Sequence, residues 1–401
     1  MNGNATKIVI LSEYVHIEQN STGYYWSQLI DCLGSKYDKT VLVSPDIYKE
    51  SKLIKKENVV HKTFFYFKSK SSSAIPKILS QLSQQLGYLK YLLTETNRKT
   101  IVFTGTNPPQ LLLLTALIKK FKKFKWVLLV HDVFPENFVP GGIINDNGIV
   151  YKLAKSVFDW GYGQPNQLIV IGRDMKELVS KKINYKSSID IISNWAIENE
   201  VTPIPKKDNE LIQSLGWQDK VVFTFFGNIG RLQGIDNLIK AIDDVTAENA
   251  AFLFLGGGHR INLLQEYIAK NPNKNIRYLG QIDAKKKSIG LNACDVSLVT
   301  LGEGMLGLGV PSKSYSSMAA GNPILIVAEQ SSEISVLVNE IGIGWVCEPG
   351  KPAQLASLID TICNERLHEK TIDVRKYFEN NFTESIVLEK FENVFERLTK
   401  H

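Results

Sequence analysis

The chain has 401 residues, of which 44% are apolar and 22% charged, and its net charge is +6. This length predicts about two domains, and the composition is that of a soluble globular protein. The longest apolar run, residues 111–118, is too short to cross a bilayer, which takes roughly 20 residues. The cysteines are far apart and form no CxxC pair, so neither a zinc site nor a disulfide framework is indicated (Cys32, Cys294, Cys347 and Cys363).

Short β-rich runs alternate with helical patterns along the whole chain. Because these runs are continuously apolar, they are typical of parallel strands that are covered on both faces. Seven fall in the first half, at residues 7–11, 40–44, 59–67, 100–106, 126–132, 168–172 and 189–193. Six fall in the second half, at residues 221–227, 251–257, 276–280, 296–301, 323–328 and 344–349. Between the runs, apolar residues recur with helical spacing, as at Trp26, Leu29, Ile30 and Leu33.

This alternation predicts an α/β fold with two Rossmann-like, doubly wound domains that face a central cleft. Residues 1–197 form the first domain and residues 198–381 the second. The polar segment 199–208, which contains Pro203 and Pro205, is the predicted linker. A final helix, within residues 382–401, is expected to pack back on the first domain. Ligands of such sheets bind beyond the carboxyl ends of the strands, so the loops there are the candidate sites.

The positive charge is concentrated in the first half. Residues 1–195 carry 26 Lys and Arg against 15 Asp and Glu, whereas the remainder carries 21 against 26. The run 119–125 places basic and aromatic residues beside a leucine-rich helix, a pattern that favours contact with anionic lipid. An ordinary solvated face and a nucleic-acid surface are the alternatives, and no nucleic-acid-binding motif accompanies the charge.

The first strand of the second half ends in a glycine-rich loop that leads into a helix. Glycine lets the backbone approach a ligand, and a helix N-terminus offers unpaired N–H groups to an anion. Arg231 adds a cation that suits a diphosphate. We therefore predict anion binding in this loop, the alternative being a tight turn with a surface arginine. A second glycine-rich loop, residues 255–260, follows the next strand.

One motif matches the dinucleotide fingerprint GxGxxG. Its glycines are Gly302, Gly304 and Gly307, and Glu329 closes the next strand. Pro311 and further glycines delay the following helix, however, and the motif lies in the fourth strand–loop unit of its half rather than the first. We therefore do not predict NAD(P) binding.

Residues 307–321, GLGVPSKSYSSMAAG, combine glycines, which have no side chain to cover the backbone, with one lysine and a helix that contains several small residues. The glycines would offer main-chain N–H groups to a phosphate or a sugar, Lys313 would pair with a diphosphate, and Ser312 would donate to it. The small residues 319–321 would let the helix pack closely. The alternative is a structural helix with a lysine that faces solvent.

Together these segments closely resemble the retaining, two-domain glycosyltransferases called GT-B, family 4, and above all their bacterial O-antigen, capsule and exopolysaccharide branch. The resemblance rests on GNIGRLQG (227–234), the loop after 251–257 and VPSKSYSSMAAGNPI (310–324). In the first half it rests on HDVFPENFVPGGII (131–144), IVIGRDMKELV (169–179) and ISNW (192–195).

The resemblance implies a nucleotide-sugar donor on the second domain, an acceptor that enters from the first, and transfer with retention. The chain contains no Asp-x-Asp sequence, which transferases of the other major fold use to hold a divalent ion. A site without metal or cofactor is therefore expected, in which Arg231 and Lys313 stabilise the departing diphosphate. His131 would face the sugar and complete the catalytic set, the alternative being a buried structural histidine.

The resemblance also implies the remaining site residues. The donor-binding set is Gly227, Asn228, Gly230, Gly257, Glu303, Leu308, Gly309, Ser312, Ser316 and Glu329. The acceptor-side set is Thr22, Gly23 and Tyr24, in a loop expected to be flexible, with Asp132, Glu136, Arg173 and Asn194. The chain departs from the family pattern at Ser316 and Leu308, where many members carry glutamates, and at Gln233, where a lysine is common. Glu303 and Glu329 are the candidates for the missing carboxylate.

The sequence thus predicts a glycosyltransferase that moves a sugar from a nucleotide diphosphate, UDP rather than GDP, to a hydroxyl of a lipid-linked saccharide in surface polysaccharide synthesis. It is expected to be cytoplasmic and peripherally attached to the anionic inner face of the cell membrane, with no nucleic-acid partner. Two alternatives stay open. One is a nucleotide-sugar epimerase of the same fold, and the other is a non-catalytic relative that scaffolds other transferases.

Overall fold

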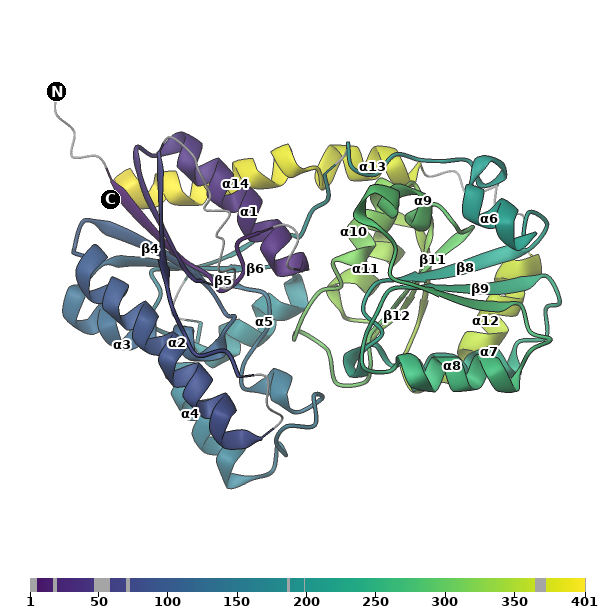
Figure 1. The fold of residues 1–401 in the computed structure, drawn as a ribbon, viewed down its shortest axis with the longest axis horizontal. Helices are drawn as coiled ribbons and strands as arrows, with labels where there is room; N and C mark the ends of the chain where they lie inside the picture. Colours follow the sequence, from purple (N-terminus) through teal and green to yellow (C-terminus); the bar gives the residue numbers. More distant parts are fainter. Residues whose placement is uncertain are drawn as a thin grey trace.

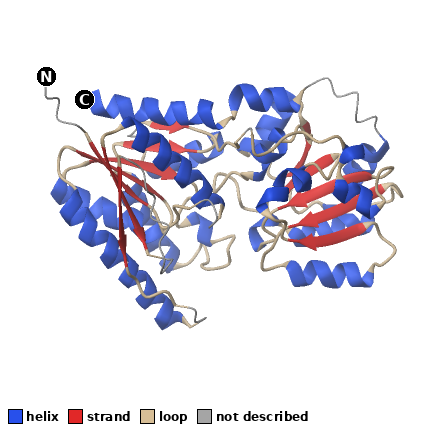
Figure 2. Ribbon diagram, turned by 45° about the horizontal axis from the view of Figure 1, so that its top comes forward, coloured by secondary structure: helices blue, strands red, loops and turns tan. Residues whose placement is uncertain are grey.

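A computed structural model describes residues 6–16, 20–46, 58–69, 73–185, 188–197, 199–364 and 373–400. It contains two separate parallel sheets, each flanked by helices (Figures 1 and 2). This architecture confirms the predicted pair of Rossmann-like domains.

The first sheet has seven strands in the order β3-β2-β1-β4-β5-β6-β7. Its strands are β1 (Lys7–Leu11), β2 (Lys39–Pro45), β3 (Val59–Phe64), β4 (Thr100–Gly105), β5 (Lys125–Val130), β6 (Gln167–Val170) and β7 (Ile189–Ile191). The strand order reverses between β1 and β4, which is the position where open parallel sheets bind ligands.

The second sheet has six strands in the order β10-β9-β8-β11-β12-β13. Its strands are β8 (Val221–Phe226), β9 (Ala250–Leu255), β10 (Ile276–Gly280), β11 (Val296–Thr300), β12 (Ile324–Val327) and β13 (Gly344–Cys347). The reversal lies between β8 and β11, so the loops after these two strands meet at the edge where a ligand is expected.

Helices cover both faces of each sheet. The first domain contains α1 (Ser21–Lys36), α2 (Ala74–Glu95), α3 (Pro109–Lys122), α4 (Ile149–Tyr162) and α5 (Arg173–Lys182). In the second, α6 (Glu210–Leu215), α7 (Ile235–Asp244), α8 (Ile261–Lys270), α9 (Lys287–Leu291), α10 (Lys313–Ala319), α11 (Glu333–Ile341) and α12 (Pro352–Asn364) surround the sheet. The chain ends in α13 (Val374–Asn381) and α14 (Glu384–Lys400). Helices α2, α3 and α4 contact one another in turn and form one layer, with α1 and α14 on the opposite side of the sheet (Figure 1).

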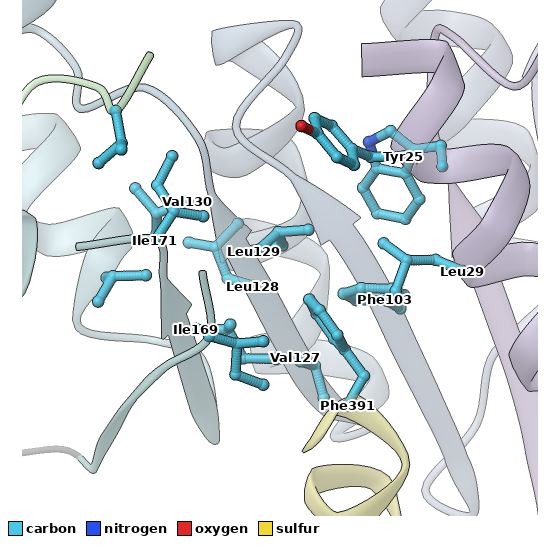
Figure 3. Close-up of a cluster of buried hydrophobic side chains, with 14 of the residues drawn as sticks. Tyr25, Leu29, Phe103, Val127, Leu128, Leu129, Val130, Ile169, Ile171 and Phe391 are labelled. Carbon is cyan, nitrogen blue, oxygen red and sulfur yellow. The ribbon is translucent and has the colours of Figure 1, made fainter. Parts of the chain in front are cut away.

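The C-terminal helix α14 packs on the first sheet although it follows the second domain. Phe391 and Phe395 are buried, and their rings lie 6.5 Å and 5.1 Å from that of Phe103 on β4. Figure 3 shows Phe391 beside Phe103 and Val127 in this core. The burial of such aromatic side chains fixes the helix to the first domain, since each removes a large apolar surface from water.

The chain crosses between the domains twice, and the two crossings touch. Ala196 and Thr383 form an isolated parallel bridge, in which the Ala196 N–H donates to the Phe382 carbonyl at 3.3 Å. The predicted linker is tied to the second domain, because the N–H of Ile204 donates to the Asn292 side chain at 2.9 Å. Within the described residues, no helix is both long enough and apolar enough to cross a membrane.

Candidate functional site

A cavity of about 300 Å³ lies between the two domains. The first domain contributes the start of α1, the end of β5 and the segment after β7, and the second contributes the loops after β8 and β11. Because each of these segments except the start of α1 follows the carboxyl end of a strand, the cavity occupies the expected place for a ligand. We call it the central pocket. Of the residues predicted from sequence, it brings together Thr22, His131, Asp132, Asn194, Asn228, Gly309, Ser312 and Lys313.

Lys313, the first residue of α10, is the cation of the central pocket. Its Nζ lies 4.1 Å from the centroid of the Phe225 ring and donates to the carbonyl of Asn228 at 3.3 Å. Burial lowers the pKa of Lys313 to about 7. Among the described residues, no carboxylate forms an ion pair with it. A desolvated cation without a counter-ion is a ready partner for an anion, since the ligand supplies the missing charge.

The glycines around Lys313 have a packing role. Gly227 has a φ of 135°, and a Cβ there would lie 2.5 Å from the Cε of Lys313. The side chain of Lys313 therefore reaches the pocket across a position that only glycine can fill. In the second loop, a Cβ on Gly256 would lie 1.9 Å from the Gly227 oxygen. The second loop thus needs glycine chiefly to pack against the first, and Gly257 supports it by accepting the Ile229 N–H at 2.7 Å.

Gln233 occupies the position where the family pattern has a lysine, and it braces the first loop. Its Oε1 accepts the Gly230 N–H at 3.0 Å and the side-chain amide of Asn228 at 3.5 Å. Both Asn228 and Gln233 line the central pocket. The loop after β8 therefore offers neutral amides to a ligand there, and Lys313 carries the charge.

His131 stands at the end of β5 on the first-domain wall of the pocket. Its ring stacks at 24° on that of Tyr25, with 6.2 Å between the centroids. Burial lowers the pKa of His131 to about 4, so the imidazole is neutral at physiological pH. A neutral imidazole can donate one hydrogen bond and accept another, which suits contact with sugar hydroxyl groups.

Asp132, the neighbour of His131, is bound by the side-chain amides of two asparagines. Its carboxylate accepts from Asn107 at 2.8 Å and from Asn137 at 3.0 Å. Burial raises the pKa of Asp132, while these two hydrogen bonds oppose the shift. These hydrogen bonds connect Asp132 to the segments around Asn107 and Asn137, and none of those described joins its carboxylate to the imidazole of His131.

Arg231 does not line the central pocket. It belongs to a short 3₁₀ turn, Arg231–Gln233, and lines a second cavity of about 550 Å³. Glu303 lines the same cavity, which we call the outer cavity. Arg231 and Lys313, which the sequence analysis placed together at one diphosphate, therefore line two different cavities, and Leu232 lines both of these cavities.

The other predicted donor residues also lie outside the central pocket. Glu329 accepts the Gly304 N–H at 2.9 Å through Oε1, while its buried Oε2 has no hydrogen-bond partner within the described structure. Leu308 is buried and lines a third cavity with Glu136. Ser316 is half-buried in α10. Neither Glu303 nor Glu329 thus reaches the central pocket to replace the missing carboxylate.

Several acceptor-side predictions are changed by the structure. Thr22, Gly23 and Tyr24 are not in a loop but in the first turn of α1, which Asn20 caps by accepting the Gly23 N–H at 2.9 Å. The loop predicted from the sequence, residues 19–25, also includes Gln19, which lies outside the described residues. The hydroxyl of Tyr24 accepts the Ile197 N–H at 3.1 Å, which ties α1 to the segment that leaves the domain.

Glu136 and Arg173 are both engaged in ion pairs. Glu136 pairs with the buried Lys182 at 2.7 Å. Arg173 reaches across to the second domain, where it pairs with Glu333 at 3.0 Å and Glu340 at 2.8 Å on α11. These residues therefore hold elements together. Of the four acceptor-side residues predicted after Tyr24, Asp132 and Asn194 are the two that line the central pocket.

The comparisons with known proteins identify the family. The profile of the family described as Glycosyl transferases group 1 matches residues 207–382. The chain is 42% identical to the probable glycosyltransferase WbjE of Pseudomonas aeruginosa over 385 residues, which is 96% of both chains. The chain belongs to the group 1 glycosyltransferases.

Solved structures agree with this family at the level of the fold. The glycosyltransferase superimposes on Anabaena HepE, solved in complex with UDP, with a TM-score of 0.71 and 16% identity over 98% of this chain and all of that one. It also matches WaaG, a glycosyltransferase of lipopolysaccharide biosynthesis, with a TM-score of 0.68 and 12% identity over 96% and 99% of the two chains. The domain architecture is therefore GT-B, as predicted.

The candidate residues of the glycosyltransferase site left out one prominent member, Tyr25, although the expected acceptor-side loop, residues 19–25, ends at this residue. Tyr25 is buried in the pocket wall, where its hydroxyl donates to the Trp195 carbonyl at 3.2 Å and its ring supports His131. Its spacing of one helical turn from Ser21, which also lines the pocket, was the available signal. No group of His, Cys, Asp or Glu suited to a metal ion occurs within the part of the chain that the structure describes.

Proposed function

We propose that this glycosyltransferase transfers a sugar from a UDP-sugar to a hydroxyl group of a lipid-linked saccharide, with retention at the anomeric carbon and without a metal ion. The observation that carries the proposal is Lys313, a desolvated cation without a carboxylate partner among the described residues, at the switch point of the second sheet. The UDP bound to Anabaena HepE supports the choice of nucleotide.

In this mechanism the ammonium group of Lys313 stabilises the diphosphate as it departs. The bond between the anomeric carbon and the phosphate oxygen breaks while the acceptor oxygen bonds to that carbon on the same face. The acceptor's proton passes to the departing phosphate oxygen, so atoms and charges balance. Electrostatic stabilisation of the leaving group is the main catalytic term, and the N–H groups of the loop before α10 add to it.

His131 holds the sugar from the opposite wall. Because its imidazole is neutral, it is suited to hydrogen bonding with hydroxyl groups rather than to proton transfer near neutral pH. Ser312 and Asn194, which also line the pocket, supply further hydrogen bonds to the donor and the acceptor respectively.

We also propose that the protein binds the anionic inner face of the cell membrane through the layer formed by α2, α3 and α4. This layer exposes apolar side chains at helical spacing, and the end of α3 at Lys119–Lys123 is basic. The exposed apolar residues are Ile75, Ile78, Leu79, Leu82, Leu86 and Leu93 on α2, Leu117 and Phe121 on α3, and Ile149, Val150, Leu153 and Val157 on α4. Apolar side chains that enter the interface and lysines that meet anionic headgroups are the two components of peripheral attachment.

The test of the donor site is thermal stabilisation by UDP, GDP, CMP and NADH, measured on the wild type and on Lys313→Met. A ligand at 100 times its Kd adds about 2.7 kcal/mol, which raises the melting temperature by several degrees. We expect UDP alone to stabilise the wild type and to lose this effect in the variant. Failure of every nucleotide to bind the wild type would favour a non-catalytic scaffold, and conversion of a UDP-sugar without transfer would favour an epimerase.

A further inference from the structure

Tyr25, on α1, lies where three separate segments of the chain meet in the wall of the central pocket. These segments are the end of β5 at His131, the first crossing between the domains at Trp195 and the loop before α10 at Ser312. The first two belong to the first domain, and the third belongs to the second domain. Only 6% of the Tyr25 surface is accessible, so its position is set by these neighbours rather than by solvent.

The hydroxyl group of Tyr25 joins the two domains. It donates to the carbonyl of Trp195 at 3.2 Å, and this bond uses its single hydrogen. Burial raises the pKa of Tyr25, and a hydrogen bond with Ser312 opposes this shift. A hydrogen bond lowers the pKa of a phenol when it is donated to the oxygen, because it stabilises the charged form. Ser312 is therefore the donor, and the Tyr25 hydroxyl has one partner in each domain.

The ring of Tyr25 contacts the imidazole of His131, which has little else to orient it. The backbone N–H of His131 donates to Thr106 at 3.3 Å, but among the described residues no hydrogen bond holds its side chain. The rings of Tyr25 and His131 are 24° from parallel and 6.2 Å apart, within the range of aromatic pairs. The ring of Trp195 meets that of Tyr25 edge-on, with 4.6 Å between the centroids. Tyr25 is thus itself held in place while it supports the histidine.

Ser312 connects this contact to the charge of the donor site. It directly precedes Lys313, the cation of the central pocket, and its oxygen can still accept a hydrogen bond from a donor sugar. Trp195 lies one residue before the bridge between the two crossings. The hydrogen bond between Tyr25 and Ser312 can exist only while the two domains face each other across the pocket. Tyr25 therefore links the position of the histidine wall to that of the cation.

We propose that Tyr25 is a positioning residue of the sugar transfer: its ring sets the orientation of the His131 imidazole, and its hydroxyl holds the loop before Lys313 against the first domain. This inference rests on the proposed function, because it assigns what brings the two walls of that pocket into register. Tyr25 takes no part in the bond changes themselves. Its loss should slow the reaction more than it weakens binding, since the transition state requires the narrower geometry.

The test separates the ring from the hydroxyl group with two variants. Tyr25→Phe keeps the ring beside His131 and removes the two hydrogen bonds, whereas Tyr25→Leu removes both ring and hydroxyl. Tyr24→Phe is the matched control, because the Tyr24 hydroxyl also binds the crossing segment, at the Ile197 N–H, but does not line the central pocket. Thermal unfolding checks that all three variants are folded.

Transfer is measured as release of UDP from UDP-glucose, UDP-galactose or UDP-N-acetylglucosamine, with a lipid extract from cells that lack this protein as the acceptor. The Kd for UDP is measured separately by calorimetry. The titration of the His131 imidazole is followed by proton NMR without any substrate, and His131→Asn assigns its signal.

We expect kcat to fall about hundredfold in Tyr25→Leu, the effect of a misplaced reacting group, and about tenfold in Tyr25→Phe, the effect of one hydrogen bond. The Kd for UDP and the KM for the donor should stay within about threefold of the wild type, and Tyr24→Phe should keep the wild-type kcat. Because burial lowers the pKa of His131 to about 4, loss of the ring should raise it toward the ordinary value of about 6.5 in Tyr25→Leu alone.

An unchanged kcat in both Tyr25 variants would overturn the inference. An equal loss in Tyr24→Phe and Tyr25→Phe would also overturn it, because the effect would then come from the attachment of α1. A Kd for UDP that rises as far as kcat falls would make Tyr25 a binding residue instead. If the wild type neither binds UDP nor releases it from a donor, the proposed function fails. An unchanged pKa of His131 in Tyr25→Leu would contradict the positioning role independently of that outcome.

Discussion

The ammonium group of Lys313 lies 4.1 Å from the centre of the Phe225 ring. Among the described residues that line the central pocket, Lys313 is the only cation, and it packs on an aromatic face. A cation over a ring is stabilised by the ring's electrons, but far less than by a carboxylate or by water. The protein therefore keeps a charge that is poorly compensated until an anionic ligand arrives. This relationship determines how the donor site should respond to mutation and to pH.

Lys313→Met should remove most of the affinity for UDP. The substitution keeps an unbranched side chain against Phe225 and removes the ammonium group, with its charge and its hydrogen bond to the Asn228 carbonyl, so the fold should be retained. The loss of one charge-assisted hydrogen bond costs about 1.5–3 kcal/mol, which corresponds to a Kd about ten- to hundredfold higher. Calorimetry with UDP measures this, and Lys207→Ala, an exposed lysine outside the pocket, is the control. Wild-type affinity in Lys313→Met would assign the diphosphate to other groups.

The affinity for a UDP-sugar should depend on pH because the pKa of Lys313 is lowered to about 7. The ligand binds the protonated form, so its affinity is constant below pH 7 and falls as the pH rises through 7, by up to tenfold for each further unit. At pH 7.5 the complex must therefore take up a proton. Calorimetry in buffers of different ionisation enthalpy detects this uptake, which should vanish in Lys313→Met. Affinity that rises above pH 7 would contradict the assignment.

The sequence was sufficient for the fold and for the loops that carry the site. Parallel strands appear as continuous apolar runs, and a loop after such a strand can be placed at the carboxyl edge without a structure, which locates His131, Asn228 and Lys313 in one pocket. Side-chain direction is a different matter. Arg231 and Asn228 are three residues apart in one loop, yet a short 3₁₀ turn sends them to different cavities.

Contacts between the domains could not be predicted from the sequence either. Arg173 stands at a strand end that should face the cleft, but its partners Glu333 and Glu340 are more than 150 residues away along the chain. Gly256 shows the same limit. A glycine-rich pattern indicates that the backbone approaches another group closely. Only the structure shows that for Gly256 this group is the backbone of Gly227 rather than a ligand.

The pair between Arg173 and Glu333 should help to hold the two domains together. The Glu333 carboxylate also accepts the backbone N–H of Arg173 at 2.6 Å, at the start of α5, so it binds both the side chain and the helix end. Because the Arg173 side chain is 43% exposed, we expect the pair to contribute only about 1 kcal/mol. Glu333→Gln should increase the radius of gyration measured by small-angle X-ray scattering and weaken UDP-sugar binding only slightly. Exposed Glu379→Gln is the control, and equal scattering from both would argue against this role.

Membrane attachment should depend on the apolar stripes of α2 and α4. Leu86 and Leu153 each have 65% of their surface exposed, so glutamate at either position should leave the fold intact. In the double variant Leu86→Glu and Leu153→Glu, each substitution replaces an apolar side chain that enters the interface with a charge that anionic lipid repels. We expect at least a tenfold loss of binding to vesicles of phosphatidylglycerol and phosphatidylethanolamine, measured by sedimentation, with an unchanged Kd for UDP.

The double variant Leu279→Glu and Tyr185→Glu is the control, because it changes exposed residues outside the α2–α4 layer and should bind vesicles as the wild type does. Equal binding of all three proteins would mean that another surface carries the attachment.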